Sequence, residues 1–224
     1  MRVLSLVLRT LGSLTLAVAV VSQLQRSVAN ESAGTGHVAY VVANFFSFFT
    51  IESNVMAIGI LALGAAYSLG MAREPAWFGT ARAAVTTYMV VTGIVYNLLL
   101  RGIELPQGTT VGWSNEILHV VGPLIVLLDW LLFADSRRLP RRAVWWIVAF
   151  PIAWVAYTLL RGAVGVDPRT GLGWYPYPFL NPDTSANGYS SVVFYVLLIA
   201  GVITLAGLGV VRSAGWRRAA LVSP

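Results

Sequence analysis

The chain has 224 residues, of which 57% are hydrophobic and 11% are charged, and its mean hydropathy is +0.74. A soluble domain carries about a quarter charged residues, so this composition excludes a soluble globular protein and predicts an integral membrane protein. The sequence contains no cysteine, which excludes disulfides, thiolate nucleophiles and cysteine-bound metals. All cationic side chains are arginines, and they lie at the ends of apolar runs, which argues against nucleic-acid binding.

Six apolar runs are each long enough to cross a hydrocarbon core of roughly 30 Å as a helix. They cover residues 8–24, 39–68, 80–101, 113–133, 142–161 and 189–211. We therefore predict an all-α fold, in which residues 1–224 form one domain of six transmembrane helices. Arg2 and Arg9, followed by the apolar stretch LTLAVAVV and by Ser27-Val28-Ala29, also resemble a cleavable signal peptide, which is an alternative interpretation of the N-terminal segment.

The arginines are distributed unevenly between the two sides of such a bundle. If the N-terminus lies in the cytoplasm, eleven of the fifteen arginines fall on the inner side and four on the outer side. Because cytoplasmic loops carry an excess of arginine and lysine, we predict a multi-pass protein of the plasma membrane with both termini in the cytoplasm. The basic segment 134–142 is then an inner loop, and Asp129 is expected to pair with it. Segment 162–188 becomes the longest outer connection.

The second run contains the polar segment FFSFFTIESN, residues 45–54. In a regular helix Ser47, Thr50 and Asn54 share one face, whereas Glu52 points to the opposite side. Lipid tolerates such groups poorly, so we expect the shared face to point toward other helices. One interpretation is that these residues only pack, because serine and threonine bond to their own helix and join neighbouring helices.

The fourth run contains SNEILH, in which Asn115 and Glu116 precede His119 by four and three residues and share its face. Pro123 deprives the His119 carbonyl of its helical partner, which predicts a kinked or hydrated helix beside the histidine. Thr50 and His119 both fall in the outer half of their spans. In nucleophilic catalysis, a hydroxyl nucleophile lies beside an imidazole base, and a third group orients that imidazole. Asn115 or Glu116 is the candidate orienting group, and a hydrogen-bonded core histidine is the alternative.

Further candidate binding residues lie at the predicted outer side. Arg101 and Arg161 end the third and fifth runs, where they either reach toward lipid headgroups or bind a substrate carboxylate. The run WYPYPFLNP, residues 174–182, is predicted to be extended or turned because of its prolines. Within it, Trp174 and Tyr177 are typical of an interfacial belt or of the mouth of a site.

The segments FFSFFTIESN, LRGIELP, SNEILHVVGPLIVLLDWLLF, YTLLRGA and GWYPYPFLN occur in this order along nearly the whole chain. They resemble the family of the androgen-induced and androgen-dependent TFPI-regulating proteins. The most specific pieces are N-x-x-x-H-x-x-x-P at Asn115, His119 and Pro123, and the WYPYPFL run. The loop between the fourth and fifth spans differs from that of the eukaryotic members.

This resemblance implies an integral-membrane threonine hydrolase that cleaves fatty acid esters of hydroxy fatty acids. Thr50 matches the family's nucleophile and His119 its catalytic histidine. The expected partners are membrane lipids and a lipid ester substrate, without a cofactor, a metal or nucleic acid. Ser47, Asn54, Asn115 and Glu116 are the supporting residues that we expect around this pair.

The hypothetical mechanism has His119 take the Thr50 proton as the hydroxyl attacks the ester carbonyl, after which water releases the acyl-threonine. Asn54 and Asn115 are both candidate oxyanion donors. A transporter of small molecules or lipids is an alternative function, since polar midspan residues and proline kinks are typical of one. A structural membrane protein is another. A haem protein is disfavoured, because His37 is the only other histidine and lies at the outer rim.

Overall fold

A computed structural model describes residues 2–71, 74–103, 109–133 and 139–214 of the chain. The described residues form helices and loops without strands, and six helical segments are long and apolar enough to cross a membrane. These segments are α1 (Arg2–Ala33), α3 (Phe49–Ser68), α4 with its continuation (Ala76–Leu100), α5 to α6 (Gly112–Phe133), α7 (Ala143–Val164) and α8 (Tyr189–Ser213). This confirms the predicted all-α fold with six apolar helices.

Two of the predicted spans differ from the observed helices. Helix α1 has 32 residues instead of the predicted 8–24. At 1.5 Å per residue it is about 48 Å long, which exceeds the hydrocarbon thickness. The second run is not one helix over 39–68, because α2 (Val38–Phe45) ends before Phe46 and α3 begins only at Phe49.

The break at residues 46–48 is held by contacts with distant parts of the chain. Phe48 has an extended backbone, with φ −73° and ψ 127°. The Trp154 indole N–H donates to the Ser47 carbonyl at 3.1 Å, and that carbonyl would otherwise accept an intrahelical bond. The Phe48 ring packs edge-on against the ring of Trp174 at 5.5 Å. The break is therefore a product of tertiary packing.

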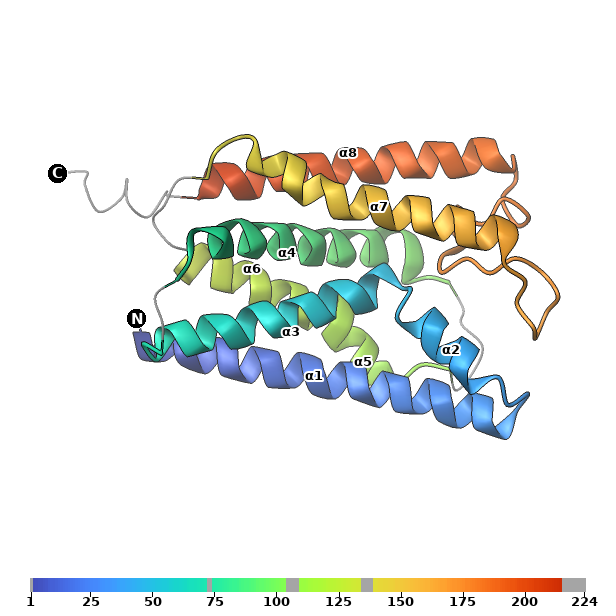
Figure 1. The fold of residues 1–224 in the computed structure, drawn as a ribbon, viewed down its shortest axis with the longest axis horizontal. Coiled ribbons are helices and arrows are strands. Elements are labelled where there is room, and N and C mark those ends of the chain that lie inside the picture. The colour runs from blue at the N-terminus through green and yellow to red at the C-terminus, as the bar shows by residue number, and fades with distance from the viewer. Residues whose placement is uncertain (1, 72–73, 104–108, 134–138, 215–224) are drawn as a thin grey trace.

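The helices form a layered bundle (Figure 1). Helices α7 and α8 lie side by side in one layer, α1 and α3 pack along each other in another, and α4 lies between them. The start of α1 and the end of α8 lie at the same end of the bundle. The loop between α7 and α8 lies at the opposite end, near the helix break.

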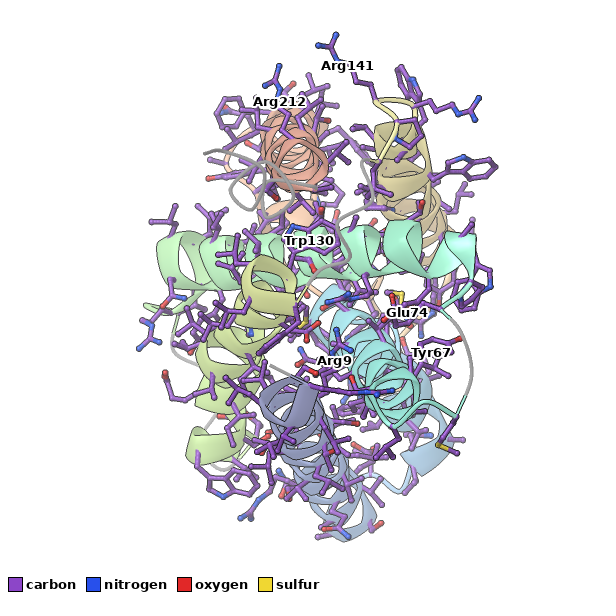
Figure 2. All side chains as sticks on the ribbon, turned by 90° about the vertical axis from the view of Figure 1, so that its left-hand side faces the viewer. Arg9, Tyr67, Glu74, Trp130, Arg141 and Arg212 are labelled. Carbon is purple, nitrogen blue, oxygen red and sulfur yellow. The ribbon has the colours of Figure 1, made fainter. Side chains whose placement is uncertain are left out.

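A buried ion cluster joins three helices near the end of the bundle where α1 starts and α8 ends. The Asp129 carboxylate of α6 accepts from Arg9 of α1 at 2.7 Å and from Arg82 of α4 at 2.6 Å. Figure 2 looks onto this end and shows Arg9 among the helices, whereas Arg141 and Arg212 extend outward. Asp129 was predicted to pair with the basic segment 134–142, of which residues 134–138 lie outside the described part of the chain. Among the described residues, its two carboxylate oxygens are bound by Arg9 and Arg82.

Candidate functional site

The helix break places Thr50 in the first turn of α3. Among the described hydrogen bonds, the helical ladder of α3 begins with the bond from the Glu52 N–H to the Phe48 carbonyl, and no side chain caps the helix. The Thr50 N–H therefore precedes the first intrahelical bond. It donates instead to the phenol oxygen of Tyr177 at 3.2 Å. The partial positive charge of the helix N-terminus is thus directed toward Thr50.

The Thr50 hydroxyl lies against His119, at 3.2 Å between Oγ1 and Nε2. The other ring nitrogen, Nδ1, lies 2.9 Å from the backbone carbonyl oxygen of Asn115. A carbonyl only accepts hydrogen bonds, so Nδ1 carries the ring proton and Nε2 of the neutral ring is an acceptor. The Thr50 O–H consequently donates to His119 Nε2. This is the orientation in which a histidine can take a hydroxyl proton.

The helix that carries His119 is irregular, as Pro123 predicted. A π-helical turn, Ile117–Val121, separates α5 (Gly112–Glu116) from α6 (Gly122–Phe133). A second π-helical turn, Tyr96–Leu100, continues α4 on the neighbouring helix. Such turns re-aim side chains and are frequent at functional sites. The two turns bring the rings of Tyr96 and His119 into a stack, with centroids 3.9 Å apart and an interplanar angle of 20°.

The groups that orient His119 differ in part from the prediction. Asn115 acts through its backbone carbonyl, while its side-chain amide donates to the Tyr96 hydroxyl at 2.5 Å. Glu116 is bonded to Arg101 at 2.9 Å, so the prediction that it orients the imidazole is not supported by its contacts. Tyr96 was missed as a site residue, because its sequence position at the end of a span is equally typical of an interfacial tyrosine.

Asn54 and Ser47 occupy other roles than expected. The Asn54 amide N–H₂ donates to the carbonyls of Thr50 at 2.8 Å and of Leu118 at 3.1 Å. Asn54 thus links α3 to the turn that carries His119, and its amide nitrogen donates to backbone carbonyls on both sides. Ser47 lies in the break, with its hydroxyl 3.0 Å from that of Tyr157. The predicted common face of Ser47 and Thr50 is wrong, because no continuous helix connects them.

A cavity of about 280 Å³ adjoins the Thr50 hydroxyl. Its walls come from α3, α4, α7 and α8 and from residues 177–180, and most of the lining side chains are apolar. The lining residues are Phe49, Thr50, Val91, Thr92, Val95, Tyr96, Leu100, Trp145, Val148, Pro151, Ile152, Trp154, Val155, Tyr177, Phe179, Leu180, Val196, Ile199, Ala200, Ile203 and Thr204. Along α7 the wall extends from Trp145 to Val155, which corresponds to about 15 Å of helical rise. The cavity therefore gives mainly apolar surroundings to any group bound beside Thr50.

The two outer arginines differ in how their charges are balanced. Arg101 forms its ion pair with Glu116, and both side chains are about half exposed, at 45% and 48%. Arg161 donates through Nη2 to the Asn44 side-chain oxygen at 2.5 Å, and its guanidinium lies over the Trp174 ring at 4.8 Å. Its Nη1 is buried without a hydrogen-bond partner among the described residues. Of the two arginines, Arg161 is therefore the one with a buried donor that has no partner among the described residues.

Comparison of the chain with models of known families, with curated proteins and with solved structures found no match. Within residues 2–71, 74–103, 109–133 and 139–214, no three histidine, aspartate or glutamate side chains gather closely enough to hold a metal ion. The fold and site thus define a helical bundle with six membrane-length apolar helices, in which Thr50 lines an apolar cavity and contacts His119.

Proposed function

We propose that this chain is an intramembrane hydrolase of lipid esters that uses Thr50 as nucleophile and His119 as general base. The observation that carries this proposal is the 3.2 Å contact between Thr50 Oγ1 and His119 Nε2 beside the apolar cavity. The resemblance to the androgen-induced and androgen-dependent TFPI-regulating proteins favours fatty acid esters of hydroxy fatty acids as substrates, and the proposal includes membership of that family.

The proposed reaction has two halves. Thr50 Oγ1 forms a bond to the ester carbonyl carbon while its proton passes to His119 Nε2. The tetrahedral intermediate then expels the alcohol, which takes the proton from His119, and acyl-Thr50 remains. A water molecule attacks this ester, His119 again accepts and returns a proton, and the fatty acid leaves. The Asn115 carbonyl on Nδ1–H and the Tyr96 ring stacked on the imidazole both stabilise the cationic form of His119.

The same proposal includes the orientation of the protein in the plasma membrane. Placing both termini in the cytoplasm follows the arginine asymmetry of the sequence. Thr50, near the opposite end of the bundle, then lies in the outer half of the membrane. A lipid ester would reach it from the outer leaflet, so membrane lipids are the proposed partners. The chemistry requires only side chains and water, and we propose no cofactor.

Arg161, Arg101, Trp174 and Tyr177 are the proposed substrate-binding residues. Arg161 is favoured for a substrate carboxylate because its Nη1 is an unused buried donor. Arg101 is the weaker candidate, since Glu116 already neutralises its charge. Trp174 lies against the Arg161 guanidinium and would cover a carboxylate bound there.

The test is labelling of membranes with a lipid-like fluorophosphonate, a probe that forms a covalent bond with activated hydroxyl nucleophiles. We expect strong labelling of the wild type, weak labelling of Thr50→Ser and none of Thr50→Ala or His119→Ala. Ser53→Ala is the matched control, because Ser53 is a fully buried hydroxyl on the same helix that is absent from the cavity wall. Equal labelling of all variants would refute the hydrolase and leave the transporter or structural protein as the better account.

A further inference from the structure

The phenol of Tyr177 reaches the reacting hydroxyl from outside the helical spans. Its oxygen lies 3.2 Å from the Thr50 backbone nitrogen and 3.2 Å from Thr50 Oγ1. Tyr177 belongs to the connection between α7 and α8, where Pro176 and Pro178 flank it. Its ring is stacked on the Phe179 ring, with centroids 5.2 Å apart and an angle of 4°. The hydroxyl is therefore held at the site by a stiff aromatic segment.

The hydrogens of this cluster can be assigned from the partners alone. The Thr50 O–H donates to His119 Nε2, as shown above, so Thr50 Oγ1 has only lone pairs for Tyr177. Tyr177 must then donate its O–H to Thr50 Oγ1 and accept the Thr50 N–H. Burial raises the pKa of the Tyr177 phenol, which keeps it a protonated donor near neutral pH. The resting cluster thus contains one O–H and one N–H beside the nucleophile.

These two donors are arranged around the place where negative charge would form. The Tyr177 oxygen, the Thr50 nitrogen and Thr50 Oγ1 form a triangle, and the two edges that meet at Tyr177 measure 3.2 Å. An ester carbonyl carbon bound to Oγ1 can place its oxygen on the side of Oγ1 where these two donors lie. An oxyanion hole requires donors at such a position. Asn54 and Asn115 do not compete for this role, because their amide groups are engaged elsewhere.

We propose that Tyr177 is a catalytic residue, and that its O–H and the backbone N–H of Thr50 form the oxyanion hole. This inference rests on the proposed hydrolase function. When Thr50 Oγ1 bonds to the carbonyl carbon, the π electron pair moves onto the carbonyl oxygen and the Thr50 proton moves to His119. The Tyr177 O–H bond stays intact, and its hydrogen bond shifts from Oγ1 to the new oxyanion. The electron pair on the oxyanion then reforms the carbonyl double bond as the alcohol leaves.

The experiment compares Tyr177→Phe with the wild type on the p-nitrophenyl ester of a medium-chain fatty acid. The substitution keeps the ring that packs on Phe179 and removes only the hydroxyl. Loss of one oxyanion donor lowers kcat by about 10²–10³-fold, and we expect KM to change little. Tyr175→Phe is the matched control, an identical change two residues away that should leave kcat unaltered.

A second measurement separates transition-state stabilisation from packing. An alkyl trifluoromethyl ketone adds to Thr50 as a hemiketal oxyanion, so its affinity should fall in Tyr177→Phe by the same factor as kcat/KM. A fluorinated tyrosine at position 177 keeps the shape and makes the O–H a stronger donor, so it should bind the ketone more tightly. This second variant also tests the inference if Tyr177→Phe does not fold.

The outcomes for the two proposals are distinguishable. If Thr50→Ala still hydrolyses the ester at the wild-type rate, the proposed function itself is wrong. If Thr50→Ala is inactive but Tyr177→Phe keeps kcat within about threefold, a loss below that of an oxyanion donor, the hydrolase stands and the role of Tyr177 is refuted. A raised KM with unchanged kcat, or unchanged ketone affinity with fluorotyrosine, would likewise overturn it.

Discussion

Replacement of Asp129 by asparagine should strongly destabilise the bundle. One carboxylate serves two guanidinium groups here, with Arg9 at 2.7 Å and Arg82 at 2.6 Å, and all three side chains are at most 5% exposed. Asp129→Asn preserves the shape but leaves two buried cations without a counter-charge. Breaking a buried ion pair by removing one partner costs about 3–5 kcal/mol, and the two arginines place this variant toward the upper part of that range.

The assay is thermal unfolding of the detergent-solubilised protein, with Glu116→Gln as the control. That control breaks the half-exposed pair with Arg101, for which the expected cost is about 0–1 kcal/mol. A triple variant with methionine at positions 9, 82 and 129 should be far more stable than Asp129→Asn, because no unpaired charge remains. Equal stability of Asp129→Asn and Glu116→Gln, or a triple variant less stable than Asp129→Asn, would refute this reasoning.

Three further predictions concern other parts of the molecule. Gly122→Ala places a methyl group 2.5 Å from a leucine methyl of α1 and should cost about 1–3 kcal/mol in unfolding free energy, whereas Gly59→Ala meets no atom within 4 Å and should not destabilise. The hydrogen bond from Arg169 holds the pKa of Asp167 below its ordinary value of 3.8. Asp167→Asn should therefore unfold at a lower temperature at neutral pH, and its difference from wild type should vanish as the pH falls through the folded-state pKa. Arg161→Gln should raise KM about tenfold for esters with a free carboxylate, through loss of a charged hydrogen bond, and leave KM for uncharged esters unchanged, as paired kinetic assays would show.

The spans could be predicted from the sequence because each is a long apolar run, and this signal does not depend on how the helices pack. The close approach of Thr50 and His119 could also be anticipated. Both side chains are polar in apolar segments and lie at comparable depths, so a bundle that buries polar groups tends to bring them together. The structure places them 3.2 Å apart. Helix ends were less predictable, and α1 is much longer than the apolar part of its sequence.

The wrong predictions around this pair share one cause, which is the assumption of regular helices. Periodicity placed Ser47 on the same face as Thr50, but the chain between them is not helical. The contacts that hold this segment in a non-helical conformation come from residues distant in the sequence, including Trp154, which is 107 residues from Ser47. Tyr96 was also out of reach for this reasoning, and Tyr177 was expected only at an interfacial belt or at the mouth of a site, because helix periodicity relates residues within one element only. Their positions at the site depend on how separate elements pack.

The helix break has a consequence for the proposed chemistry that a continuous helix could not supply. In a continuous helix over 39–68, the Thr50 N–H would donate to the carbonyl four residues earlier, at Phe46. It would then be unavailable to Tyr177 or to an oxyanion. The break releases this N–H and leaves the Thr50 hydroxyl against His119. A nucleophile that also contributes its own N–H must lie at a helix N-terminus, so the proposed mechanism requires the irregularity that made the second run hard to predict.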